Sequence, residues 1–131
     1  SLRILVVDDN RDAAESLELV LRHLGAQVRV AFGGREALEC VRDDMPSVVL
    51  LDIGMPEMNG YEVARELRSC YGPALRLVAL SGWGQEVDRA RGRAAGFDQH
   101  LIKPADIETL RALLDDVVGS TGPVAQPLTT G

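Results

Sequence analysis

The run Val48-Val49-Leu50-Leu51, followed at once by Asp52, places four apolar residues in a row. A strand with one wet face alternates apolar and polar residues, whereas a parallel strand covered by helices on both faces reads as a continuous apolar run. We therefore expect residues 48–51 to form a strand that is buried on both faces. Asp52 then follows at the carboxyl end of this strand.

Segments of two kinds alternate on either side of this strand. Short apolar or β-branched stretches predict further strands at 3–7, 28–31, 75–80 and 100–102. Apolar residues spaced three and four apart predict helices at 11–24, 36–41, 61–67, 86–95 and 107–118. This alternation predicts an α/β domain over 1–118, with a doubly wound, five-stranded parallel sheet and helices on both faces. The turn-forming composition of 119–131 predicts a flexible C-terminal tail.

The composition is that of one globular domain. The 131 residues are 46% hydrophobic and 26% charged, with a formal net charge of −6. An acidic excess disfavours direct binding of DNA or RNA, which needs clustered positive charge. The apolar runs are far shorter than the roughly 18 residues needed to cross a bilayer, so we expect no membrane contact by this domain. Cys40 and Cys70 are too few for a disulfide framework and indicate reduced thiols in the cytoplasm.

Polar and charged residues gather where the predicted strands end. Asp8 and Asp9 follow the first strand, Asp52 the third, Ser81 the fourth and Lys103 the fifth. In the strand order 2-1-3-4-5 the first and third strands are neighbours, so the three carboxylates converge on one crevice. Two unit charges about 4 Å apart repel by about 4 kcal/mol at an effective dielectric constant of 20. The cluster must therefore shift its pKa values or bind a cation.

The types of side chain favour Mg²⁺ as that cation. Carboxylate oxygens suit a hard divalent ion, and no His or Cys lies close by in the sequence. Asp52 beside Mg²⁺ and Lys103 is suited to attack phosphorus, because metal and ammonium neutralise charge on the transferring group. The Ser81 hydroxyl is then placed to hydrogen-bond a phosphoryl oxygen. Each residue alone has an ordinary structural role, but their combination at four strand ends favours a functional site.

Five segments carry a resemblance to a known family: Asp8-Asp9, Leu50-Leu51-Asp52-Ile53-Gly54-Met55-Pro56, Asn59-Gly60, Ser81 and Lys103-Pro104. Together they resemble the receiver domain of bacterial two-component response regulators, over residues 3 to about 118. The resemblance implies a flavodoxin-like fold. It also implies that Asp52 is the phosphoacceptor and that Asp9, Asp52 and the Gly54 carbonyl are ligands of Mg²⁺. Asp8 would act through a metal-bound water.

The resemblance assigns roles to three more residues. Ser81 would be the switch hydroxyl that moves toward the phosphoryl group, and Lys103 would contact this group. The peptide bond before Pro104 would be cis. The implied partner is a histidine kinase or a histidine phosphotransfer domain that donates the phosphoryl group. The implied chemistry is self-catalysed phosphoryl transfer and dephosphorylation rather than turnover of a substrate.

Two residues near the site are candidates for controlling the conformational switch or the lifetime of the aspartyl phosphate. His100 stands where many members of the family carry Tyr or Phe as an aromatic switch, and we interpret it either as an altered or pH-sensitive switch or as a half-exposed ring. Trp83 either tunes the access of water to the phosphorylated Asp or anchors its loop. It is the only tryptophan, so we expect its fluorescence to report the binding of Mg²⁺ or a phosphoryl analogue. His23 is interpreted as a surface residue.

Three other functions fit parts of the pattern. A Mg²⁺-dependent aspartyl-phosphate phosphohydrolase normally carries a second Asp two residues after the nucleophile, where this chain has Gly54. A nucleotide or flavin binder requires a Gly-rich phosphate loop after the first strand, where Asp8-Asp9-Asn10 repels phosphate. A receiver-like module that binds partners without phosphorylation does not require the full set of site residues, which is present here.

The protein that contains this domain is a separate hypothesis. The run Leu80-Ser81-Gly82-Trp83-Gly84-Gln85-Glu86 and the run His100-Leu101-Ile102-Lys103-Pro104 resemble the receivers of hybrid sensor histidine kinases. The chain also begins without an initiator Met. We therefore expect the terminal receiver of a hybrid kinase, with a stand-alone response regulator as the alternative.

Overall fold

A computed structural model describes residues 2–55, 58–82 and 89–120. Its centre is a five-stranded sheet in the order β2-β1-β3-β4-β5, in which every strand pair is parallel. The strands are β1 (Arg3–Val7), β2 (Gln27–Ala31), β3 (Val48–Asp52), β4 (Arg76–Ser81) and β5 (Gln99–Ile102). The predicted α/β fold and its strand order are therefore confirmed.

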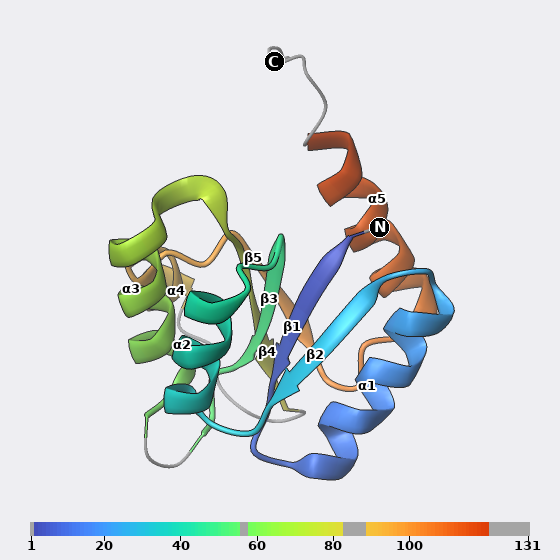
Figure 1. The fold of residues 1–131 in the computed structure, drawn as a ribbon, viewed down its shortest axis with the longest axis horizontal. Coiled ribbons are helices and arrows are strands. Elements are labelled where there is room, and N and C mark those ends of the chain that lie inside the picture. The colour runs from blue at the N-terminus through green and yellow to red at the C-terminus, as the bar shows by residue number, and fades with distance from the viewer. Residues whose placement is uncertain (1, 56–57, 83–88, 121–131) are drawn as a thin grey trace.

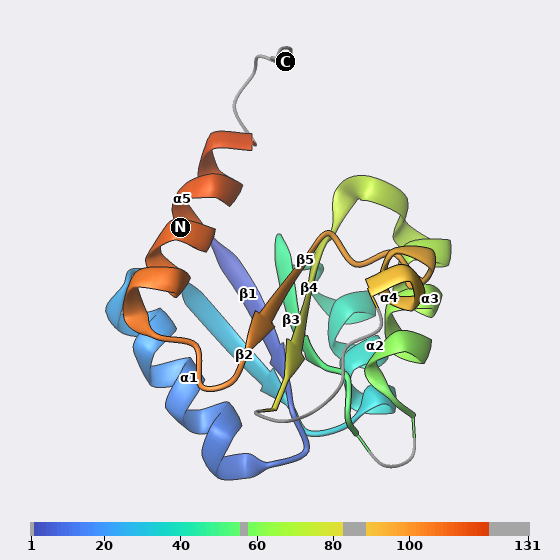
Figure 2. The same cartoon turned by 180° about the vertical axis from the view of Figure 1, so that it is seen from behind.

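Helices cover both faces of the sheet. They are α1 (Arg11–His23), α2 (Gly34–Asp43), α3 (Gly60–Tyr71), α4 (Arg89–Ala95) and α5 (Ile107–Ser120), with a short turn of 3-10 helix, η1, at Gly72–Ala74. Helices α1 and α5 lie on one face and α2, α3 and α4 on the other, as Figure 1 and Figure 2 show from opposite sides. Within the described ranges, no helix combines the length and apolar character that a bilayer crossing requires. The sheet thus separates two apolar cores, one under each layer of helices.

Strand β3 is buried along its whole length. It lies between β1 and β4, and all five of its residues are buried. Val49 and Leu51 pack in the core under α2 and α3, whereas Val48 and Leu50 pack in the core under α1 and α5. Burial of one Val or Leu side chain stabilises a fold by about 1.5–3 kcal/mol. This run therefore anchors both cores and carries Asp52 into the interior.

The connection from β1 to α1 ends in a helix cap. Asn10 is the cap, and its Oδ1 accepts from the Ala13 N–H at 3.1 Å. Asp8 is buried, and its Oδ1 accepts from the Asn10 N–H at 3.0 Å. Since Asn caps a helix without a charge, the carboxylates of Asp8 and Asp9 remain available for the site.

Helix ends differ from the prediction. Helix α3 extends to Tyr71 rather than ending at Leu67. Helix α5 runs to Ser120 rather than ending at Val118. Residues 121–131 lie outside the described residues, and the flexible tail expected after this helix stays a prediction. Val117 packs in the core under α1 and α5. Such tertiary contact outweighs the weak helix preference of a glycine near a helix end.

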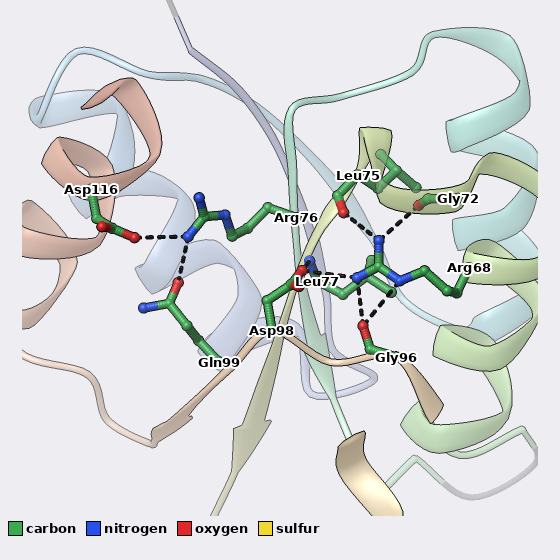
Figure 3. A network of polar contacts seen from close by, with 9 residues as sticks. All are labelled: Arg68, Gly72, Leu75, Arg76, Leu77, Gly96, Asp98, Gln99 and Asp116. Atoms are coloured by element: carbon green, nitrogen blue, oxygen red, sulfur yellow. Dashed lines mark hydrogen bonds and ion pairs between the residues drawn. The ribbon is translucent and has the colours of Figure 1, made fainter. Parts of the chain in front are cut away.

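At the amino edge of the sheet, the side chain of Arg68, from α3, links the segments that precede β4 and β5 (Figure 3). Its guanidinium donates to the carbonyl oxygens of Gly72, Leu75 and Gly96 and to the carboxylate of Asp98. The same carboxylate accepts from the Leu77 N–H at 2.9 Å. One side chain therefore ties the ends of α3 and α4 to the starts of β4 and β5. The other ends of these two strands lead into the functional site.

Candidate functional site

Charged residues from three strand ends meet at the carboxyl edge of the sheet, the lower edge in Figure 1. Asp8 and Asp9 follow β1, Asp52 ends β3 and Lys103 follows β5. Carboxylate oxygens from the three aspartates lie within 4.8 Å of one another. Lys103 Nζ lies 2.9 Å from Asp8 Oδ2 and 3.5 Å from Asp52 Oδ2. The fold thus brings together the charged residues that the sequence predicted to converge.

Negative charge exceeds positive charge in this cluster. Asp8 is 2% exposed and Asp52 is 5% exposed, whereas Asp9 is exposed. In the described part of the chain, the cation in contact with these carboxylates is Lys103. Three ionised carboxylates against one ammonium leave an excess of two negative charges. This excess of negative charge is unfavourable at a partly buried site, because solvent screens buried charges poorly.

The pKa values of Asp52 and Lys103 are both raised, for different reasons. Burial raises the pKa of Asp52; the Gly54 N–H and the Lys103 ammonium lower it, and the charge of Asp8 raises it again. Burial lowers the pKa of Lys103, but the hydrogen bond to Asp8 and the charge of Asp52 outweigh burial, so this pKa is raised. Lys103 therefore stays protonated at neutral pH. A further cation near Asp52 would favour its ionised form.

The three carboxylates offer the oxygen ligands that Mg²⁺ prefers. One carboxylate oxygen from each aspartate lies within 4.8 Å of the others, so together they could hold such an ion directly or through a bound water. Asp8 already holds Lys103, which suits the indirect role through water. The acidic cluster is therefore of the kind that is typical of a magnesium site.

The backbone around Asp52 holds its carboxylate in place. Asp52 Oδ1 accepts from the Gly54 N–H at 3.0 Å. A Cβ on Gly60 would lie 2.6 Å from the Asp52 carbonyl oxygen and 2.6 Å from Ile53 Cα, so only glycine fits there. The sequence did not predict this role of Gly60. The one signal it offered is that Gly60 belongs to the Asn59-Gly60 segment of the family resemblance. The expected ligand role of the Gly54 carbonyl stays a prediction.

Ser81 and His100 lie next to this cluster and are hydrogen-bonded to each other. Ser81 Oγ lies 2.8 Å from His100 Nε2. Ser81 is 1% exposed, and the backbone N–H of Lys103 donates to its carbonyl oxygen at 2.7 Å. Across the described residues, the hydroxyl of Ser81 is bonded to His100 and not to Asp52. The contact is not predicted from the sequence, because its partners are 19 positions apart.

The remaining residues singled out in the sequence lie in different places. The peptide bond before Pro104 is cis, as the resemblance implied. Trp83 lies outside the described residues. His23 is exposed in the last turn of α1. Cys40 and Cys70 are free thiols, the first buried and the second exposed, and neither belongs to the carboxylate cluster.

Two hollows flank the carboxylate cluster. One, of about 590 Å³, has a lining that includes Asp8, Leu17 and Lys103, and it runs between α1 and the segment after β5. The other, of about 450 Å³, has a lining that includes Asp9, Met55 and the first residues of α2. A partner molecule can therefore approach the cluster along either side.

The sequence matches a family and its curated members. The model of the response regulator receiver domain matches residues 4–115. The response regulator MprA of Mycolicibacterium vanbaalenii is 41% identical over 122 residues, which are 93% of this chain and 52% of MprA. MprA of Mycobacterium bovis BCG is 40% identical over 123 residues. The chain thus spans about half the length of the curated relatives it matches.

Solved structures share the fold over nearly their whole length. The chemotaxis protein CheY4 of Vibrio cholerae has a TM-score of 0.81 at 28% identity, over 88% of this chain and 98% of that one. The response regulator TrrA of Thermotoga maritima, solved in complex with Mg²⁺-BeF, has a TM-score of 0.80 at 28% identity, over 89% and 99%. Because the family model covers most of the chain, the protein belongs to the response regulator receiver domains of two-component signal transduction, and its site for phosphorylation is the cluster of Asp8, Asp9 and Asp52.

Proposed function

We propose that Asp52 accepts a phosphoryl group from a phosphohistidine of a partner protein. The position of Asp52 carries this proposal: it is nearly buried at the end of β3, 3.5 Å from Lys103 Nζ and beside two further carboxylates. One oxygen of Asp52 attacks phosphorus and forms a P–O bond. The P–N bond of the donor breaks, and its electron pair moves to the imidazole nitrogen. The product is an aspartyl phosphate.

Lys103 acts on the charge of the transferring group. In the unphosphorylated protein, Lys103 Nζ lies 3.5 Å from Asp52 Oδ2. During the transfer the ammonium donates to a phosphoryl oxygen instead. Asp8 holds the ammonium at 2.9 Å during this step. When held by Asp9 and Asp52, Mg²⁺ supplies further positive charge to the phosphoryl oxygens. The Gly54 N–H keeps Asp52 Oδ1 in place, which leaves Oδ2 as the attacking oxygen.

In this proposal, Ser81 changes its hydrogen bonding when Asp52 is phosphorylated. A phosphoryl group on Asp52 adds negative charge and strong acceptor oxygens, and the Ser81 hydroxyl turns toward them as a donor. The turn changes the contacts of Ser81 with β5, so the outcome of phosphorylation is a change in conformation and in affinity for partners. Trp83, outside the described residues, is assigned the tuning of water access to the aspartyl phosphate.

Intact-mass spectrometry after incubation with acetyl phosphate and Mg²⁺ tests the phosphoacceptor. We expect one phosphoryl adduct on the wild type, none with a chelator and none on Asp52→Ala. Asp106→Ala replaces an exposed aspartate outside the cluster, and this matched control keeps the adduct. A folded, Mg²⁺-binding protein that forms no adduct and binds no beryllofluoride would contradict the proposal. A receiver-like module that binds partners without phosphorylation would then take its place.

Receiver domains of this family act with histidine kinases, and we propose that this one docks its donor over α1. The donor is a histidine kinase or a histidine phosphotransfer domain. Its phosphohistidine has to reach Asp52, and the hollow that runs from Asp8 and Lys103 along α1 offers the approach. Leu19, 69% exposed, follows along the same helix and offers an apolar contact.

An exposed apolar residue on α1 tests this docking surface. Leu19→Asp is expected to slow transfer from a phosphohistidine donor about fivefold, the effect of losing one interface contact, and to leave transfer from acetyl phosphate unchanged. Val118→Asp changes a similarly exposed residue of α5, 59% exposed, and serves as the control. Equal slowing by both variants, or slowing with acetyl phosphate, would contradict docking over α1.

The parent protein is a separate proposal, for which two architectures have support. The runs 80–86 and 100–104 resemble the receivers of hybrid sensor histidine kinases. The curated relatives named above are response regulators, and the matched region is about half of each, which favours a receiver joined to a further domain. The reading frame around this coding sequence separates the two. A kinase core upstream supports the hybrid kinase, and an output domain downstream supports the response regulator.

The domain boundary and the compartment complete the proposal. The described part of α5 runs to Ser120, so we place the end of the receiver unit there. Deletion of 121–131 is then expected to leave the Tm unchanged. The free thiols of Cys40 and Cys70 fit a reducing compartment. A cytoplasmic location is checked by cell fractionation of the full-length protein.

A further inference from the structure

The side chain of Ser81 points to the opposite face of the sheet from Asp52. Ala79 pairs with His100 across β4 and β5. Because side chains alternate along a strand, Ser81 and His100 point to the same face as Ala79, which packs in the core under α2 and α3. Asp52 pairs with Leu80, which packs in the other core, under α1 and α5. The hydroxyl and the carboxylate therefore start on different faces.

The hydrogen bond to His100 keeps the Ser81 hydroxyl turned toward β5. A buried hydroxyl is stable only with a partner, and Ser81 is 1% exposed. The imidazole supplies that partner, since His100 Nε2 lies 2.8 Å from Ser81 Oγ. To reach a phosphoryl group on Asp52, the Ser81 side chain has to turn about its Cα–Cβ bond and leave the imidazole. The bond to His100 is thus broken when the hydroxyl turns toward Asp52.

We propose that His100 is a positioning residue that holds the Ser81 hydroxyl toward β5 and away from Asp52, so that a phosphoryl group on Asp52 competes with the imidazole for this hydroxyl. The inference rests on the proposed function of Asp52 and Ser81 and extends it to His100. Of the two interpretations of His100 drawn from the sequence, it favours the altered switch over the half-exposed ring. Loss of the imidazole contact favours the phosphorylated conformation.

Calorimetric titration with beryllofluoride in saturating Mg²⁺ tests the competition, because this ion imitates a phosphoryl group on a carboxylate. His100→Phe keeps a planar ring but cannot bond the hydroxyl, and we expect it to bind beryllofluoride about fivefold more tightly than the wild type, the weight of one ordinary hydrogen bond. His100→Gln carries an amide that can keep the bond, and we expect an affinity close to that of the wild type.

A double-mutant cycle shows whether His100 acts through Ser81. Ser81→Ala is expected to weaken beryllofluoride binding, because the hydroxyl no longer contacts the analogue. His100→Phe is then expected to have no effect in the Ser81→Ala background, since the imidazole has no hydroxyl to hold. An equal gain in both backgrounds would show that His100 acts on packing alone and would overturn the inference. Thermal melts confirm folding, and His100→Met replaces His100→Phe if the latter does not fold.

The wild-type protein separates a failure of this inference from a failure of the proposed function. A wild type that binds Mg²⁺ but no beryllofluoride overturns the proposed function, and the inference with it. A wild type that binds the analogue, together with a folded His100→Phe that binds it no more tightly, overturns the inference alone. Tighter binding by His100→Phe that Ser81→Ala cancels supports it.

Discussion

At each edge of the sheet a basic side chain lies among oxygen atoms, and the two groups of contacts differ in charge balance. At the amino edge, Arg68 donates to three carbonyl oxygens and to Asp98 (Figure 3), so one cation faces one anion. At the carboxyl edge, Lys103 contacts Asp8 and Asp52 while Asp9 lies beside them, so negative charge is in excess. The contacts of Arg68 at the amino edge are balanced in charge by the protein itself, whereas the cluster at the carboxyl edge needs a further cation for balance.

This difference separates a structural network from a site that needs a ligand. At the amino edge, the groups that Arg68 contacts gain hydrogen bonds that offset the loss of water, so the network stabilises the native state. At the carboxyl edge, burial raises the pKa of Asp52 and the excess charge disfavours its ionisation. Carboxylates with unfavourable charge and shifted pKa values are concentrated at functional sites, where a bound ligand or the reaction compensates the charge. Substitutions at the two edges should therefore change different quantities.

Lys103→Met is expected to have the largest effect, and on the chemistry. It removes the ammonium that neutralises the transferring group, and loss of one such donor slows a reaction by about 10²–10³-fold. The rate of adduct formation with acetyl phosphate and saturating Mg²⁺, followed by intact-mass spectrometry, measures this loss. Lys103→Arg, which keeps the charge, should recover part of the rate. A loss below tenfold in Lys103→Met would remove Lys103 from the proposed reaction.

Arg68→Met is expected to act on stability instead. Three carbonyl oxygens lose their donor, so the free energy of unfolding should fall by about 3 kcal/mol and the Tm by about 10 °C. The rate of phosphorylation of the folded protein should stay within about twofold of the wild type. Arg65→Met, at an exposed position of the same helix, is the matched control and should change stability by less than about 0.5 kcal/mol. An Arg68→Met protein that is as stable as the wild type but is phosphorylated slowly would contradict the assignment of Arg68 to stability alone.

Gly60→Ala is expected to affect both quantities moderately. Its Cβ would lie 2.6 Å from the Asp52 carbonyl oxygen, so the backbone of the phosphoacceptor has to shift. We expect a loss of about 2 kcal/mol in stability, as for an overpacked core, and phosphorylation about tenfold slower. Gly119→Ala, where a Cβ would meet nothing within 4 Å, is the control. Urea unfolding and intact-mass kinetics check both variants, and a Gly60→Ala protein equal to the wild type would refute the close approach.

The smallest effect is expected in the pH dependence of stability of the metal-free protein. Because burial raises the pKa of Asp52, the folded state binds more protons than the unfolded state at pH values above the usual Asp pKa of about 3.9. The contribution of Asp52 to the free energy of unfolding therefore falls as the pH rises from about 4 through the raised pKa. Each unit of difference between the two pKa values corresponds to about 1.4 kcal/mol.

Urea unfolding in a chelator at a series of pH values measures this contribution as the difference between the wild type and Asp52→Asn. The difference should fall with rising pH and then level off. Asp106→Asn should give the opposite sign, because the Thr109 N–H lowers the pKa of Asp106 and its contribution is lost as the pH falls through this lowered pKa. A difference for Asp52 that rises with pH would show that its ionised form is already stabilised without a cation.

The sequence predicted the members of the carboxylate cluster because strand direction alone determines where they lie. Asp8, Asp9, Asp52 and Lys103 each follow a strand, and all strands of a parallel sheet end at the same edge. The contact between Ser81 and His100 was not predictable in this way, because it depends on which face each side chain takes and on their separation across β4 and β5. The roles of Gly60 and Arg68 depend on how α3 lies against the sheet.

The sequence by itself therefore determined the order of the elements, the parallel sheet and the set of charged residues at its carboxyl edge. Apolar periodicity is a local property of the chain, and a helix between successive strands favours parallel pairing. The tertiary structure alone decided which polar groups are satisfied. Arg68 finds its partners in two separate segments, 72–75 and 96–98, and Ser81 finds His100 on the neighbouring strand. Hydrogen bonds and ion pairs act over a few ångströms, so their partners are known only once the helices have packed on the sheet.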